Sequence, residues 1–139
     1  MSPITRNQSW NHDFSKILGE SADLMMRKGE VMKARAYNRA RDTIQRIDQD
    51  IRSVEQLQNT PTIGATIYDK LDEYAKTGKV AMLEQFKNDP LILFTNVYGI
   101  GPKKAEELVK KHNIRSIEEL REKQETVLNN IQRIGLRYY

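Results

Sequence analysis

The sequence contains no cysteine, no long apolar run and little glycine or proline. Without cysteine, the 139-residue chain forms neither disulfide bonds nor thiolate metal sites. No apolar stretch approaches the ~20 residues that cross a membrane, and the polar amino terminus is unlike a secretory signal. These absences exclude disulfide-stabilised and membrane-spanning classes. They predict an intracellular protein without a membrane partner, nuclear if its source is eukaryotic.

Charge is abundant but nearly balanced. Lysine and arginine number 23 against 19 acidic residues, which gives a net charge of +4. Such a small surplus supports binding to nucleic acid only where the cations cluster. The length suits one globular domain or two small subdomains, and we expect a monomer.

Hydrophobic residues recur at helical spacing in nearly every segment after residue 10, and no alternating strand pattern is present. The fold class is therefore predicted to be all-α, with a polar arm at 1–10 and two small helical subdomains at 11–87 and 88–139. The expected helices cover 12–29, 30–47, 53–58, 65–78, 80–89, 101–112, 116–123 and 125–132. Gly29 and Gly78 end the first and fourth of these helices, and Pro90 ends the fifth.

Two segments share a short repeat. "TPTIGATIYDKL" at 60–71 and "VYGIGPKKAEEL" at 97–108 align as x-x-[TG]-I-G-x-x-x-x-x-x-L, each a tight turn that opens a helix. A glycine turn before a helix leaves N–H groups pointing outward, where the helix dipole favours an anion. Lys103 and Lys104 oppose that dipole, and a bound anion would resolve the conflict. The alternative is a tight inter-helix turn without a ligand.

One lysine lies beside an apolar stripe. Ile63, Ile67, Leu71 and Tyr74 share one face of the helix at 65–78, and Lys70 falls roughly 60° from Ile67. Its stem could rest on the core with the ammonium in water. Alternatively, a partly desolvated amine at this position could attack a carbonyl carbon. On the preceding helix, Lys33 and Tyr37 are ordinary edge residues or line a phosphate pocket near Lys70.

Four blocks in order resemble the X family of DNA polymerases. They are "KARAYNRA" (33–40), "IYDKLDEYAKTGK" (67–79), "FTNVYGIGPKKA" (94–105) and "QRIGLRYY" (132–139). The resemblance covers nearly everything after residue 11 and is greatest to the beta-type members. It implies a lyase-like domain and a thumb-like DNA-binding subdomain, each with one helix–hairpin–helix motif. The chain would then be the amino-terminal fragment of a longer polymerase, continuous with a palm domain.

The resemblance also implies roles for individual residues. Lys70 would be the nucleophile that forms a Schiff base with the opened abasic sugar, and β-elimination would release 5′-deoxyribose phosphate. The implied phosphate pocket contains Lys33, Tyr37 and Asp69. The implied DNA contacts are Thr62, Gly64, Thr66, Gly99, Gly101, Lys103 and Lys104. The implied ligands of a monovalent cation (Na⁺ or K⁺), with no organic cofactor, are the carbonyls of Thr95, Val97, Ile100, Gln58, Thr60 and Ile63.

Several positions depart from the family pattern. Thr66, Gln58 and Met82 stand where the family has phosphate-pocket lysines, and Met32 replaces a histidine. Gapped, nicked or 5′-incised abasic DNA is thus the expected partner, and the lyase reaction is the leading expected activity. A non-catalytic DNA-binding module with a degenerate lyase pocket is the alternative, and a helical adaptor for protein partners is a third. No D-x-D pair lies in a suitable strand, so we expect no polymerase activity from this chain alone.

Overall fold

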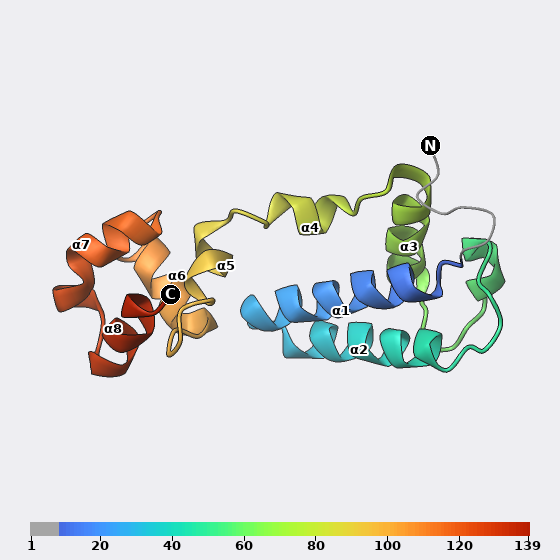
Figure 1. Cartoon of the computed structure of the whole chain (residues 1–139), viewed down its shortest axis with the longest axis horizontal. Helices are drawn as coiled ribbons and strands as arrows, with labels where there is room; N and C mark the ends of the chain where they lie inside the picture. The colour runs from blue at the N-terminus through green and yellow to red at the C-terminus, as the bar shows by residue number, and fades with distance from the viewer. Residues whose placement is uncertain (1–8) are drawn as a thin grey trace. The chain divides into compact units, whose positions relative to one another are not determined.

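The computed structural model describes residues 9–139, and in that range it contains eight α-helices, one 3-10 helix and no strand (Figure 1). The predicted all-α class is confirmed. The chain forms two compact units: the amino-terminal unit extends to Met25 and includes Glu30–Glu84, and the carboxy-terminal unit comprises Met26–Gly29 and Gln85–Tyr139. No helix within 9–139 has the length and apolarity needed to cross a membrane.

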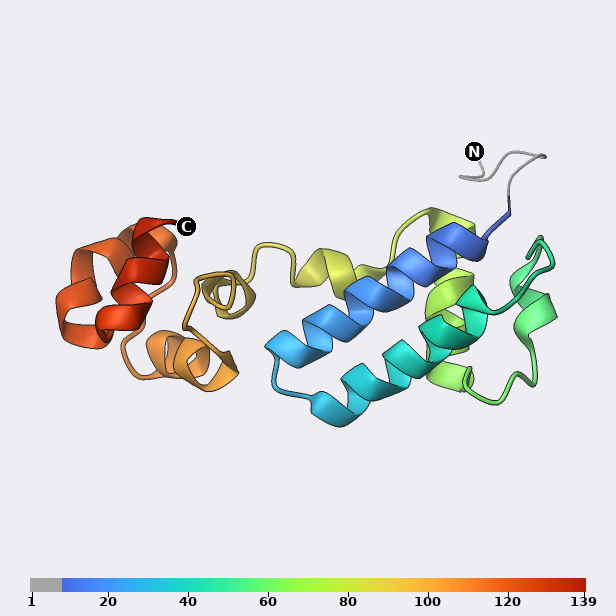
Figure 2. The same ribbon diagram turned by 60° about the horizontal axis from the view of Figure 1, so that its bottom comes forward.

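The amino-terminal unit is built on two long helices. Helices α1 (Asn11–Arg27) and α2 (Val31–Gln45) lie side by side and run in opposite directions, and α3 (Ala65–Thr77) packs near one end of the pair (Figures 1 and 2). The core side chains include Phe14, Leu18, Ile44 and Leu71, all almost fully buried. Their spacing on each helix follows the apolar faces predicted from the sequence.

Trp10 lies in this core, although the sequence analysis placed it in the polar arm. Its ring stacks on Phe14 with centroids 5.3 Å apart and meets the edge of Tyr74 at 5.9 Å. Burying a large aromatic ring removes a large apolar area from water, so tryptophan is more stable in the core than in an exposed polar segment. The arm at 1–10 therefore cannot extend to Trp10, and its residues 1–8 lie outside the described part of the chain.

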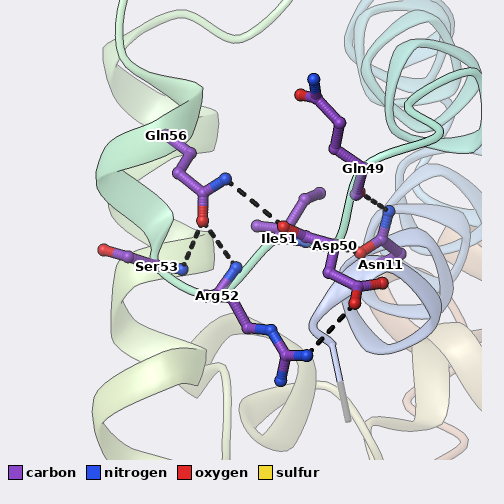
Figure 3. Close-up of polar contacts among 7 residues, drawn as sticks. All are labelled: Asn11, Gln49, Asp50, Ile51, Arg52, Ser53 and Gln56. Carbon is purple, nitrogen blue, oxygen red and sulfur yellow. Dashed lines mark hydrogen bonds and ion pairs between the residues drawn. The ribbon is translucent and has the colours of Figure 1, made fainter. Parts of the chain in front are cut away.

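Asn11 fixes the segment that leaves α2. Its side-chain amide donates to the carbonyl of Ile47 at 3.3 Å. The same amide donates to the Gln49 carbonyl at 3.0 Å, and the Asn11 oxygen accepts from the Ile51 N–H at 2.8 Å (Figure 3). The segment then enters the 3-10 helix η1 (Val54–Leu57), which Ser53 and Gln56 cap reciprocally. The predicted Ser53 cap is thus present on a 3-10 helix. These contacts direct the chain into the turn before α3.

The carboxy-terminal unit packs short helices around Phe94, Leu108, Ile114, Leu120 and Leu136. It contains α5 (Pro90–Phe94), α6 (Pro102–Lys110), α7 (Ile117–Val127) and α8 (Asn130–Arg137), with α5 against α6 and α7. The short helix α4 (Ala81–Gln85) precedes them.

Several predicted boundaries differ from the structure in this half of the chain. The helix expected at 80–89 is only α4, because Asp89 caps a new helix whose first residue is Pro90. Proline suits a first helical position, since the missing N–H would have no partner there. The helices expected at 116–123 and 125–132 are α7, which continues to Val127, and α8, which Asn129 and Gln132 cap.

Candidate functional site

The two repeats form turns with the same hydrogen bond. In the turn at 60–63, here called hairpin 1, the Ile63 N–H donates to the Thr60 carbonyl at 2.9 Å. In the turn at 97–100, called hairpin 2, the Ile100 N–H donates to the Val97 carbonyl at 3.0 Å. Hairpin 1 leads into α3 and hairpin 2 into α6, as the repeat predicted.

The helices after both hairpins begin without a side-chain cap. The residues at their N-caps are Gly64 and Gly101, whereas Ser53, Asp89, Ser116 and Asn129 cap η1, α5, α7 and α8 through side-chain oxygens. Within 9–139, the backbone N–H groups in the first turns of α3 and α6 donate no hydrogen bond. Exposed N–H groups and the positive end of the helix dipole together favour an anion.

Neither N-cap glycine is required by the fold itself. Gly64 (φ −78°) and Gly101 (φ −95°) have backbone angles that any residue adopts. A Cβ added at either position would meet nothing within 4 Å. Both positions therefore leave open space beside unpaired N–H groups, which suits a ligand that approaches the backbone closely.

The central peptides of the two hairpins have different orientations. Gly99 has φ +89° and Tyr98 is not left-handed, which is the type II arrangement, whereas neither Pro61 nor Thr62 has positive φ, as in type I. These turn types differ by roughly 150° in ψ of the first central residue, so the peptide between the central residues is turned over. Hairpins 1 and 2 therefore present different N–H groups on their outer faces.

The two lysines after hairpin 2 are not equivalent. Lys103 is exposed and makes no ion pair within the described residues, whereas the Lys104 ammonium lies 2.8 Å from the Glu107 carboxylate. The hydrogen bond from Lys104 and its positive charge lower the pKa of Glu107. His112 also lies near Glu107, at 3.7 Å. Lys103 is therefore the cation available to an anion at hairpin 2.

The two threonines predicted to contact DNA, one in hairpin 1 and one at the start of α3, also differ from each other. The Thr62 hydroxyl donates to the Thr43 hydroxyl of α2 at 2.6 Å, and Thr43 donates to the Arg39 carbonyl at 3.1 Å. Thr66 is exposed on the first turn of α3. Thr62 is thus occupied in holding the turn on α2, and Thr66 faces solvent.

An open pocket of about 440 Å³ lies where hairpin 1 meets α3. It brings together four predicted residues, Gln58, Ile63, Gly64 and Asp69, and adds Asn59, Ala65 and Tyr68. Its lining contains no lysine or arginine. The sequence analysis did not identify Asn59 and Tyr68. Asn59 has a left-handed φ of +63°, a conformation that asparagine tolerates. An asparagine just before the turn is therefore the sequence signal for this position.

Lys70, Lys33 and Tyr37 do not line this pocket. Lys70 is half-buried and has no hydrogen bond or ion pair within 9–139. Lys33 is exposed and pairs with Glu30 at 3.0 Å. Tyr37 is buried with its hydroxyl 4.0 Å from the Met82 sulfur, and burial raises the pKa of Tyr37.

The carbonyls predicted to hold a monovalent cation have spare lone pairs. Those of Thr60 and Val97 accept the turn hydrogen bonds. In the described range, no hydrogen bond reaches the carbonyls of Gln58, Ile63, Thr95 or Ile100. Uncharged oxygens of this kind suit a hard cation of low charge. No group of three or more histidine or acidic side chains that could hold a metal ion occurs in residues 9–139.

Helix α8 contributes a contact that the spacing of residues did not predict. The side-chain amide of Gln132 donates to the Gly99 carbonyl of hairpin 2 at 3.1 Å. Gln132 belongs to the block "QRIGLRYY", which was noticed only through the family resemblance.

Comparisons with known proteins match both units. The family model described as "Helix-hairpin-helix domain" matches residues 9–80, more than half of the 139-residue chain. The model described as "Fingers domain of DNA polymerase lambda" matches residues 92–139, the segment that the resemblance called thumb-like.

Curated relatives agree with these matches. The chain is 33% identical to DNA polymerase lambda of Arabidopsis thaliana over 133 residues, which is 93% of this chain and 25% of that protein. It is 36% identical over 115 residues to DNA polymerase type-X family protein pol4 of Schizosaccharomyces pombe, which is 80% of this chain and 22% of that protein. A third relative is the DNA nucleotidylexotransferase of Oncorhynchus mykiss, 28% identical over 131 residues, 91% of this chain and 25% of that protein. The chain thus spans about a quarter of the length of these relatives.

Proposed function

Because this chain belongs to the X family of DNA polymerases, we propose that it binds the sugar–phosphate backbone of gapped or nicked DNA through its two hairpins. The observation that carries this proposal is the pair of uncapped helix starts at Gly64 and Gly101, where the fold itself requires no glycine. A phosphate oxygen can approach the free N–H groups there without meeting a side chain. Such contacts carry no sequence information, so binding is independent of sequence and falls with salt.

A monovalent cation would complete this contact. The carbonyls of Gln58, Thr60 and Ile63 would hold it at hairpin 1, and those of Thr95, Val97 and Ile100 would hold it at hairpin 2. The cation would supply positive charge beside the phosphate. The four carbonyls that accept no hydrogen bond among the described residues support this assignment.

The proposed reaction is removal of 5′-deoxyribose phosphate by Lys70. The neutral amine of Lys70 attacks C1′ of the opened abasic sugar, and loss of water gives an imine. A base then takes a proton from C2′, and the electron pair breaks the C3′–O bond, which releases the DNA strand. Hydrolysis of the imine frees Lys70 and the sugar phosphate. The half-buried position of Lys70 on the helix that follows hairpin 1 supports this role, and Asp69 directly precedes it in the sequence.

The phosphate contact is tested by Gly101→Ser. A serine at this N-cap offers its hydroxyl to the free N–H groups of α6 and fills the open space, while helix stability stays equal or rises by a few tenths of a kcal/mol. We expect affinity for a one-nucleotide-gapped duplex, measured by fluorescence anisotropy, to fall at least fivefold. The control is Gly19→Ser on α1. Unchanged affinity in Gly101→Ser would contradict the proposal.

The lyase reaction is tested by borohydride trapping. Reduction of the imine with borohydride gives a covalent adduct between the protein and 5′-incised abasic DNA, visible by gel electrophoresis. Lys70→Ala should abolish the adduct, while Lys76→Ala, an exposed lysine of the same helix paired with Asp72, should leave it unchanged. An undiminished adduct in Lys70→Ala would assign the nucleophile to another amine.

A non-catalytic DNA-binding module is the second candidate function. The observation that favours it is the pocket beside hairpin 1, which has no cation in its lining. The contact between Tyr37 and Met82 adds to this, since a thioether offers a phosphate no charge. Under this alternative, the wild-type chain binds gapped DNA with the same salt dependence but gives no trapped adduct.

A further inference from the structure

Gln132 is a buried polar side chain that joins two elements of the carboxy-terminal unit. Only 8% of its surface is exposed. Its side-chain oxygen accepts from the Asn129 N–H at 3.0 Å, which completes the cap of α8. Its side-chain amide donates to the Gly99 carbonyl at 3.1 Å, across 33 positions of sequence. The two ends of one side chain therefore tie the start of α8 to the tip of hairpin 2.

Gly135, one turn further along α8, contacts the same tip. A Cβ at this position would overlap the Tyr98 carbonyl oxygen and lie 2.9 Å from the Tyr98 carbonyl carbon. The backbone of Gly135 is helical, so its conformation does not call for glycine. Glycine is needed here because the Tyr98 carbonyl approaches the helix too closely for any side chain.

The close approach at Gly135 shows the orientation of the peptide between Tyr98 and Gly99, and Gln132 holds the next peptide, between Gly99 and Ile100. A trans peptide holds its C=O and N–H on opposite sides, and no cis peptide occurs in residues 9–139. Since the Tyr98 carbonyl faces Gly135 of α8, the Gly99 N–H faces away from that helix. The type II form of the turn thus aims one extra N–H outward.

We propose that Gln132 and Gly135 are positioning residues that hold hairpin 2 in the type II form required for phosphate binding. The proposal rests on the proposed function of hairpin 2 in binding DNA. Gln132 donates to the carbonyl of Gly99 itself, and Gly135 leaves room for the carbonyl of the preceding residue, Tyr98. Without them, the central peptide is free to turn over to the type I form that hairpin 1 adopts, and the Gly99 N–H leaves the outer face.

Gln132→Glu separates the two functions of this side chain. The carboxylate still accepts from the Asn129 N–H, so α8 keeps its cap, but it donates nothing to the Gly99 carbonyl. The matched control is Gln56→Glu, because Gln56 occupies the same capping position in η1 and the charge change is identical. Both variants therefore keep their helix caps and differ in their contact with hairpin 2.

In the full chain, we expect Gln132→Glu to bind gapped duplex about 3- to 10-fold more weakly than Gln56→Glu, the loss of roughly one hydrogen bond. The Gly99 N–H is uncharged, so the slope of log K against log salt, which counts phosphates neutralised by lysine or arginine, should equal that of the control. The amide resonance of Gly99 in the free protein should shift in Gln132→Glu and not in the control. Gln132 is buried and Gln56 is exposed, so Gln132→Glu should also melt at the lower temperature. A purely structural role would lower the melting temperature and leave the Gly99 resonance and the affinity of the folded protein unchanged.

Gly135→Ala provides a second variant, with Gly19→Ala as the control at another helical glycine. It should displace the Tyr98 carbonyl, shift the Gly99 amide resonance and weaken binding at least tenfold. If it unfolds the carboxy-terminal unit, Gln132→Glu decides the question. Wild-type affinity and unchanged Gly99 resonances in the folded variants would overturn the positioning role. Absence of DNA binding by the wild-type chain would instead overturn the proposed function.

Discussion

Hairpins 1 and 2 share a repeat and a turn hydrogen bond, yet the chain supports them in different ways. Hairpin 1 has Pro61 and Thr62 at its centre, and the Thr62 hydroxyl holds it on α2 through Thr43. Hairpin 2 has Gly99 at φ +89° and is held by Gln132 of α8. The first support uses a side chain of the turn itself, and the second uses the backbone of the turn and a side chain from elsewhere.

This difference teaches that a short repeat can keep its helix start while losing its turn geometry. The glycines at 64 and 101 are equivalent in backbone angle, open space and missing caps. Two residues earlier in the motif, Thr62 favours the type I turn, whereas Gly99 permits the type II turn. Hairpin 2, with its outward Gly99 N–H and free Lys103, is the stronger candidate for binding phosphate. Hairpin 1 leads into the helix that carries Lys70.

The largest expected effect comes from Gly99→Ala. An alanine forced to positive φ costs roughly 1–3 kcal/mol, and its Cβ would lie 3.2 Å from Ile131. We expect tenfold or greater loss of affinity for nicked DNA, measured by anisotropy, together with faster hydrogen exchange in α6. The matched Thr62→Ala change should cost hairpin 1 only its hydrogen bond to Thr43. Equal losses in both variants would show that the two turns do not differ.

Asn11→Ala should destabilise the amino-terminal unit by about 1–2 kcal/mol, because three hydrogen bonds to the segment before hairpin 1 are lost (Figure 3). The single tryptophan, Trp10, is buried beside Phe14, so its fluorescence during urea unfolding reports on this unit. Asn38→Ala on α2 is the control. DNA binding through hairpin 2 should be unaffected. A loss of DNA affinity as large as the loss of stability would contradict the conclusion that the two hairpins are held by separate contacts.

The side chain that follows each hairpin at the equivalent position of the repeat can be changed to add or remove a positive charge. Lys103 and Thr66 occupy equivalent positions in the repeat, so Lys103→Ala should weaken DNA binding two- to threefold and lower the salt slope by about 0.9. Thr66→Lys should strengthen binding and raise that slope by a similar amount. Lys104→Ala should have the smaller effect, since its ammonium is paired with Glu107. A larger effect of Lys104 than of Lys103 would reverse our assignment.

The smallest expected effect is a pH dependence of the carboxy-terminal unit. The pKa of Glu107 is lowered from its ordinary 4.5 by the hydrogen bond and charge of Lys104. A lowered pKa contributes stability above the unfolded value and loses it as the pH falls through the folded value. Stability measured by hydrogen exchange in α6 should therefore fall slightly below pH 4.5, and less so in Glu107→Gln. Identical profiles would exclude a contribution from this pair.

Much of the fold was predictable because helical periodicity and stop residues are local. Gly78 ends α3 as predicted, and Phe14 and Leu18 are buried as their spacing indicated. A predicted helix boundary is wrong where one residue type occurs at both kinds of helix end. The sequence analysis predicts that Pro90 ends a helix, but Pro90 is the first residue of α5. Proline can follow the end of one helix and also suits the first turn of the next.

The candidate site was less predictable. The repeat located Gly64, Gly101 and the lysine pair, and the family resemblance supplied Lys70. The i,i+3 spacing allows Lys104 to pair with Glu107, but Lys103 and Glu106 have the same spacing, so spacing alone did not show which lysine would be paired. Nor did it show that the Asn59 and Tyr68 side chains would line the pocket beside hairpin 1.

The sequence by itself determined the all-α class, the two glycine turns and the helix that carries Lys70, because each depends on residues within a few positions of one another. Tertiary structure decided which form the glycine-containing turn of hairpin 2 adopts, and therefore which N–H groups it presents. The orientation of the Tyr98–Gly99 peptide depends on Gln132 and Gly135, more than thirty residues away along the chain. A glycine at the third position of a turn leaves both type I and type II accessible, so the surface packed against hairpin 2 selects between them.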